Sequence, residues 1–112
     1  HLILFLDRQA YLERYAQMDK AASRLNSYPV DFATFDAGAF TMAILMAAEI
    51  EGLGAGFLGG HNLPGLNQEL QVPEDFEVVG LITIGHADKA VAKVGSPRSK
   101  SRAETQHWEH WE

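Results

Sequence analysis

A long apolar run between residues 36 and 51 constrains the fold more than any other feature of the sequence. Its large apolar side chains, among them Phe40, Met42, Leu45 and Ile50, are spread too evenly for one face of a helix. A helix that is apolar all round is buried in a core, in a membrane or against another chain. Its uncharged part, residues 37–48, has 12 residues, well below the roughly 20 that cross a bilayer. We therefore expect a central core helix, or one that packs against a second subunit.

The flanks of this run carry helix-capping residues. Asp36 is a suitable N-cap, because its carboxylate can accept a hydrogen bond from the first turn of the helix. Gly52 is a suitable left-handed residue just after the C-terminus. The small residues of the run, such as Ala43 and Ala47, allow a neighbouring element to approach closely.

Other elements follow from hydrophobic spacing. Residues 2–6 form a short apolar run that predicts a buried strand. Apolar residues at helical spacing over 11–25 predict an amphipathic surface helix. Residues 64–70 predict a short helix with Pro64 in its first turn, and the β-branched run 77–85 predicts a central strand.

Length and composition limit the chain to one domain and exclude several chemistries. The 112 residues include no cysteine, so there is no disulfide, thiolate zinc site or cysteine nucleophile, which is compatible with the cytoplasm. The net charge of −6 argues against broad binding to nucleic acid or to an anionic membrane. No Lys or Arg occurs between Leu25 and Asp88, after which the cations are concentrated in one late patch. We therefore expect neither a nucleic-acid nor a membrane partner.

A dense glycine run follows the apolar helix. Five of the ten glycines lie between Gly52 and Gly60, which is typical of backbone with unusual φ or of a close approach by a neighbour. The run lacks the Gly-Lys-Ser/Thr of a phosphate loop, and it follows a helix where a dinucleotide-binding loop follows a strand. A plain loop and a backbone surface for a flat ligand both remain open.

A basic run near the C-terminus is the second candidate site. Arg98, Lys100 and Arg102 alternate with serines, and such a run can hold a phosphate or be a solvated loop. His107 and His110 lie three residues apart, but a zinc site requires a third fixed ligand, so we expect no metal. No catalytic side chain is evident, because the sequence has no GxSxG, no HExxH and no nucleophile paired with a base.

The order of these features resembles the C-terminal half of the FMN-dependent nitroreductase family. The matching features from Asp31 onward are Asp36-Ala-Gly38-Ala, the apolar helix, Ala47-Ala48-Glu-Ile-Glu-Gly52-Leu53-Gly54, Gly59-Gly60, Leu70-Gln-Val-Pro73, the strand 78–84 with Gly85-His86, the basic run and His107-Trp108. The resemblance implies an α+β flavin fold with helices around a mainly antiparallel sheet, in an intertwined homodimer. Residues 1–112 would be the C-terminal portion of one nitroreductase-like domain whose N-terminal half is absent.

The resemblance also implies a cofactor and a reaction. FMN would lie at the subunit interface, with Gly59 and Gly60 beside the flavin and with Lys100 and Arg102, or Arg98 in place of one of them, on the phosphate. NAD(P)H would supply hydride for a quinone, nitroaromatic or similar small-molecule acceptor. Because the family's N-terminal flavin ligands are missing, we expect weak or no FMN binding by the isolated chain. The alternative is a non-catalytic flavin-binding or dimerisation module of the same fold.

Overall fold

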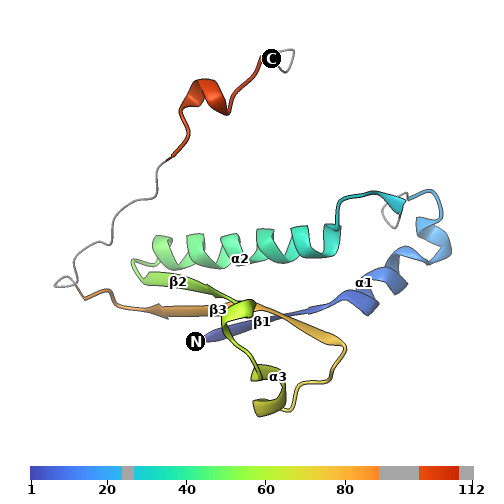
Figure 1. Cartoon of the computed structure of the whole chain (residues 1–112), viewed down its shortest axis with the longest axis horizontal. Helices are drawn as coiled ribbons and strands as arrows, with labels where there is room; N and C mark the ends of the chain where they lie inside the picture. The colour runs from blue at the N-terminus through green and yellow to red at the C-terminus, as the bar shows by residue number, and fades with distance from the viewer. Residues whose placement is uncertain (24–26, 89–98, 109–112) are drawn as a thin grey trace.

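The computed structural model is a three-stranded antiparallel sheet crossed by one long helix (Figure 1), and it describes residues 1–23, 27–88 and 99–108. The strands are β1 (Leu2–Asp7), β2 (Gly54–Gly59) and β3 (Phe76–Gly85). The helices are α1 (Arg8–Tyr15), α2 (Phe32–Ile50) and α3 (Leu66–Glu69), with the short 3-10 turns η1 (Met18–Lys20), η3 (Gly60–Asn62) and η4 (Arg102–Glu104). The predicted α+β class is confirmed.

Strand β3 lies at the centre of the sheet, as its β-branched sequence predicts. It pairs antiparallel with β1 on one side and with β2 on the other, in the order β1-β3-β2. Ile82 of β3 pairs with both neighbours and is fully buried. Strand β1 is present as predicted, but within this fully described strand Leu4 alone is buried, because β1 is an edge strand.

Helix α1 is much shorter than the helix predicted over residues 11–25. Asp7 caps its first turn by accepting a hydrogen bond of 2.8 Å from the Ala10 N–H. The helix ends at Tyr15, and Gln17 takes an extended conformation before η1 begins. None of the eight residues of α1 is buried, and a helix without packing has little to stabilise it beyond a few turns. Residues 24–26 lie outside the described residues.

Helix α2 begins at Phe32, four residues before the predicted start. Asp31, not Asp36, is the N-cap: its carboxylate accepts hydrogen bonds from the backbone N–H and the hydroxyl of Thr34. The predicted C-terminal glycine is confirmed, since Gly52 has a φ of +71°. The Gly52 N–H donates to the Glu49 carbonyl and the Leu53 N–H to the Ala48 carbonyl, the paired bonds of a Schellman motif.

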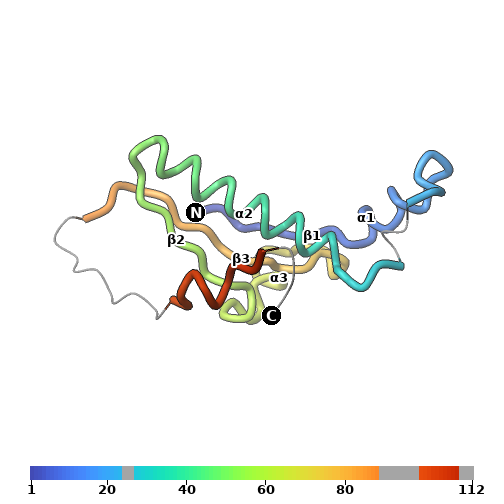
Figure 2. The backbone as a smooth tube through the Cα atoms, turned by 90° about the horizontal axis from the view of Figure 1, so that it is seen from above, coloured from blue at the N-terminus to red at the C-terminus, as the bar shows by residue number. Residues whose placement is uncertain are grey.

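The two sides of α2 differ in their surroundings. The side against β1 and β2 is a sheet-facing seam whose buried residues are small: Ala33, Thr41 and Ala48 are buried, and Ala37, Ile44 and Leu45 are half-buried. The other side is an outer stripe of exposed large residues, spaced seven, four and four residues apart along the helix: Phe35, Met42, Met46 and Ile50. Seen from above in Figure 2, α2 runs along the length of the sheet.

By length and composition, α2 is the one helix of the described chain that could cross a membrane. It has 19 residues where 16 were expected, so length does not exclude the membrane interpretation. The core helix of a soluble protein passes the same test. Contacts with β1 and β2 occupy one side of α2. The apolar residues of the outer stripe have no such contact with the sheet and remain exposed.

The chain is extended for its length. Its radius of gyration is 18.4 Å, against roughly 13 Å for a compact domain of about 100 residues. Its accessible surface is 9647 Å², against about 6,100 Å² for a compact monomer of the same mass. The single chain therefore exposes surface that a compact domain of this size would bury.

Candidate functional site

The glycine run forms a strand, which contradicts one of the two predictions made for it. Residues 54–59 are the edge strand β2, which pairs with β3 from Gly54 opposite Gly85 to Gly59 opposite Gly80. The plain-loop interpretation is therefore wrong over these residues. Of the glycines in the run, Gly52 alone has a positive φ, and it lies before the strand. Each of the other four glycines of the run has a neighbouring atom within 4 Å of the position that a Cβ would take.

The two glycines predicted to lie beside a flavin have different neighbours. A Cβ on Gly60 would lie 2.2 Å from the Val78 carbonyl oxygen of β3, so the fold itself requires glycine there. A Cβ on Gly59 would lie 2.8 Å from Cε1 of His61, which is a side-chain atom that can move. At both positions a side chain on the glycine would therefore meet other atoms of the chain.

The predicted phosphate ligands lie elsewhere. Lys100 is exposed just before η4, and Arg102 is the first residue of η4, where its Nε donates to Oε1 of Gln106. Figure 1 shows η4 well away from the sheet and from β2. Arg98 lies outside the described residues. The described structure therefore does not bring Lys100 or Arg102 to Gly59 and Gly60 within one chain.

The hydroxyl next to these cations is already engaged. Ser101 forms a capping box with Glu104, whose carboxylate accepts hydrogen bonds from both the hydroxyl and the backbone N–H of Ser101. These hydrogen bonds hold the pKa of Glu104 below its usual value. A phosphate at this run would meet Lys100 and Arg102 but would compete with Glu104 for Ser101.

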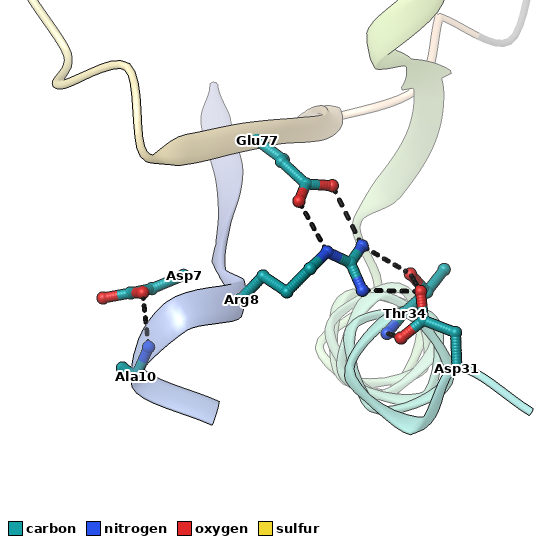
Figure 3. Close-up of polar contacts among 6 residues, drawn as sticks. All are labelled: Asp7, Arg8, Ala10, Asp31, Thr34 and Glu77. Atoms are coloured by element: carbon teal, nitrogen blue, oxygen red, sulfur yellow. Dashed lines mark hydrogen bonds and ion pairs between the residues drawn. The ribbon is translucent and has the colours of Figure 1, made fainter. Parts of the chain in front are cut away.

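A polar junction around Arg8 joins side chains from three elements, and the sequence did not predict it. Its guanidinium is bidentate to Glu77, with Nε to Oε1 at 2.6 Å and Nη2 to Oε2 at 3.0 Å (Figure 3). Nη1 donates to Asp31 Oδ2 at 2.7 Å, and Nη2 donates to the Thr34 hydroxyl at 3.2 Å. Arg8 thus joins the start of α1, the start of β3 and the N-terminus of α2.

The junction shifts the acid–base behaviour of its members. Hydrogen bonds from Thr34 and Arg8 lower the pKa of Asp31 to about 2. The Arg8 hydrogen bond also lowers the pKa of Glu77, and both carboxylates raise the pKa of Arg8. About half of each carboxylate side chain is exposed, so the junction is a partly solvated structural contact. The only sequence signal was Asp31 three residues before Thr34, a capping spacing.

Two cavities of the described structure lie near α2, and another of about 280 Å³ lies where β2 begins and β3 ends, beside Gly54 and His86. One of about 210 Å³ lies beside the polar junction and is lined by residues of α1 and of the chain before α2, including Tyr11 and Tyr28. A second of about 380 Å³ lies between β1 and α2 and is mostly apolar, with Phe40 and Val79 in its lining. Neither is lined by Gly59 or Gly60. Within residues 1–23, 27–88 and 99–108, no cluster of metal-ligating side chains occurs.

The described residues of one chain therefore keep the two parts of the predicted FMN site apart. The face of Gly59 is occupied by the ring of His61, and Gly60 packs on the Val78 carbonyl. The described cations of the basic run, Lys100 and Arg102, lie apart from both glycines. A flavin would need the His61 ring to move and cations from another source.

Comparison with known proteins gives one match. A family model described as the nitroreductase family matches residues 2–86, which include the whole sheet, α2 and the glycine run. The matched range begins well before Asp31 and ends before the basic run. The search of curated proteins found no match, and neither did the search of solved structures.

Proposed function

This chain belongs to the nitroreductase family, and we propose that it is part of an FMN-dependent oxidoreductase. The proposed reaction moves hydride from NAD(P)H to a quinone, nitroaromatic or similar small-molecule acceptor. The flavin would supply the redox chemistry. This chain would bind the flavin and position it. The family match over residues 2–86 is the observation that carries the proposal.

The proposed working unit is an intertwined homodimer. The outer stripe of α2 supports it, because Phe35, Met42, Met46 and Ile50 are 56% exposed or more and lie on one side of one helix. Exposed apolar surface of this extent marks an interaction site in a soluble protein. Residues 37–48 carry no charge, which suits a dry helix contact. In this proposal a second copy covers the stripe, no membrane or nucleic acid is involved, and the protein works in the cytoplasm.

The proposed FMN ligands come from two regions of the sequence. Gly59 and Gly60 would offer backbone N–H groups to the flavin, and Arg98, Lys100 and Arg102 would hold the phosphate. Lys100 and Arg102 lie apart from Gly59 and Gly60 in one chain, so the proposal assigns the two parts of a site to different copies or to residues beyond this sequence. A guanidinium and an ammonium form charge-assisted hydrogen bonds with a phosphate only when they lie next to it.

The visible absorbance of the purified chain after addition of FMN tests the proposal. The FMN is added at high concentration, because the isolated chain is expected to bind it weakly, and a bound-flavin spectrum that bleaches with NADH or NADPH under anaerobic conditions and recovers with a quinone would support the proposal. Replacing Lys100 and Arg102 together by Ala should then weaken FMN binding at least about tenfold. The control is Lys20→Ala, which removes a cation that lies over the Tyr15 ring. Equal weakening by both variants would contradict the assignment.

A second candidate is a non-catalytic flavin-binding or dimerisation module of the same fold. The observation that favours it is the separation of Lys100 and Arg102 from Gly59 and Gly60 in one chain. Flavin that binds but stays oxidised with both nicotinamides would identify the flavin-binding module. A dimer that binds no FMN would identify the dimerisation module.

A further inference from the structure

The imidazole of His61 lies against the last residue of β2. A Cβ built on Gly59 would lie 2.8 Å from Cε1 and 2.9 Å from Nδ1 of this ring. Real Cβ atoms do not approach so closely. The ring therefore fills the space beside the Gly59 Cα, where any other residue would place its side chain.

A hydrogen bond to the next residue orients this ring. Nδ2 of Asn62 lies 2.8 Å from Nε2 of His61. An amide nitrogen only donates, so Nε2 accepts, and the neutral ring then carries its proton on Nδ1. Nδ1 is one of the two ring atoms nearest to Gly59. The ring of His61 thus turns a proton-bearing edge toward the strand end.

We propose that His61 is a movable cover on the backbone of Gly59, which a flat ligand displaces when it binds at the end of β2. This inference rests on the proposed function, in which Gly59 and Gly60 contact FMN. His61 and Asn62 are both exposed, so the ring can swing into solvent at the loss of one hydrogen bond. Exposed side chains change rotamer within nanoseconds, so the cover is open to any ligand that competes for Gly59.

The neighbour of Gly60 differs from that of Gly59, because it is a backbone atom that cannot swing away. The atom that blocks Gly60 is the Val78 carbonyl oxygen at 2.2 Å from a built Cβ, and it belongs to the backbone of the central strand β3. That carbonyl cannot move without disturbing the sheet. Of the two predicted glycines, only Gly59 has a neighbour that can leave, so a ligand gains access to β2 at Gly59.

Nuclear magnetic resonance of the full chain tests the contact directly. In the wild type, the ring nitrogens of neutral His61 should report a proton mainly on Nδ1. Gly59→Ala, whose methyl group displaces the ring, and Asn62→Ala, which removes the hydrogen bond, should both shift the proton toward Nε2, the form that free histidine prefers in water. Gly38→Ala is the control, since nothing lies within 4 Å of a Cβ there. A proton on Nε2 in the wild type, or no change in Gly59→Ala, overturns the cover.

Titration with FMN at high concentration tests the displacement, because the resonances detect weak binding. We expect the Gly59 amide and the His61 ring to shift together, and His61→Ala to bind FMN several-fold more tightly than the wild type. An FMN-dependent shift at Gly59 without one at His61 overturns the cover and leaves the proposed function intact. If neither residue shifts in the wild type, and Gly59 does not shift in His61→Ala, the assignment of FMN to this strand is overturned, and with it the displacement.

Discussion

The two sides of helix α2 differ in the size and exposure of their side chains. The sheet-facing seam is built from small residues such as Ala33 and Ala48, which let the helix backbone lie close to β1 and β2. The outer stripe is built from large ones such as Met42 and Ile50, which contact little and remain exposed. One side of the helix thus contacts the sheet, and in the proposed homodimer a second copy would cover the other side. An even spread of apolar residues in a sequence can therefore mean two different contacts.

The largest effect should come from placing a charge on the sheet-facing seam. Ala48→Asp buries a carboxylate with no partner against the sheet, which should lower the free energy of unfolding by about 3 kcal/mol or more. Ala47→Asp is the matched control, because Ala47 is the adjacent exposed residue of the same helix. Urea unfolding followed by circular dichroism measures both variants. Equal losses for the two would mean that the seam does not face the sheet.

The outer stripe is tested by its effect on association. Replacing Met42 and Met46 together by Lys should weaken a homodimer about 100-fold, since truncating or charging two central interface residues has effects of that order. Ala47→Lys adds a charge off the stripe and should change association much less. Sedimentation over a range of protein concentrations measures the dissociation constant. A chain that is monomeric before any substitution refutes the homodimer outright.

Loss of Arg8 should separate the N-terminal end of α2 from the sheet. Arg8→Met removes the hydrogen bonds that tie Asp31 and Thr34 to Glu77. Because these side chains are partly exposed, we expect a loss of only about 1 kcal/mol in the free energy of unfolding. Arg14→Met is the control, as it breaks an ion pair with Asp19 that is local to α1 and η1. Similar losses from the two would show that the junction has no special role.

The smallest expected effect is a dependence of this junction on pH. The pKa of Asp31 is lowered to about 2 and that of Glu77 is also lowered, so both carboxylates stabilise the fold above their unfolded pKa values of roughly 4. This stability is lost as pH falls from about 4.5 toward 2. The difference in melting temperature between the wild type and Arg8→Met should therefore narrow over that range. A constant difference would show that Arg8 does not act through these carboxylates.

Local patterns in the sequence predicted the elements whose neighbours are also local. Strand β3 was placed at the centre of the sheet from its β-branched run, and Gly52 was placed at the end of α2 from its conformational freedom. The start of α2 was misplaced because Asp31 and Asp36 are both acceptable caps. The choice between them is set by Thr34 and by Arg8, from another part of the chain.

The candidate site was less predictable, because its features depend on contacts across the sheet. The glycine run was not assigned to a strand, since its pairing with β3 is not visible in local composition. Arg8 and Glu77 are 69 residues apart in the sequence, so no spacing rule relates them. The reason for glycine at position 60 is the Val78 carbonyl, which also could not be inferred before the strand register was known.

The apolar character of the outer stripe has a thermal consequence. If a second copy covers Phe35, Met42, Met46 and Ile50, association removes mainly hydrocarbon surface from water, and its heat-capacity change is negative. The attraction between such surfaces near room temperature is largely entropic and weakens on cooling. Two copies of this chain should therefore separate more readily in the cold than at growth temperature, so a protein stored on ice could lose its quaternary structure before its fold.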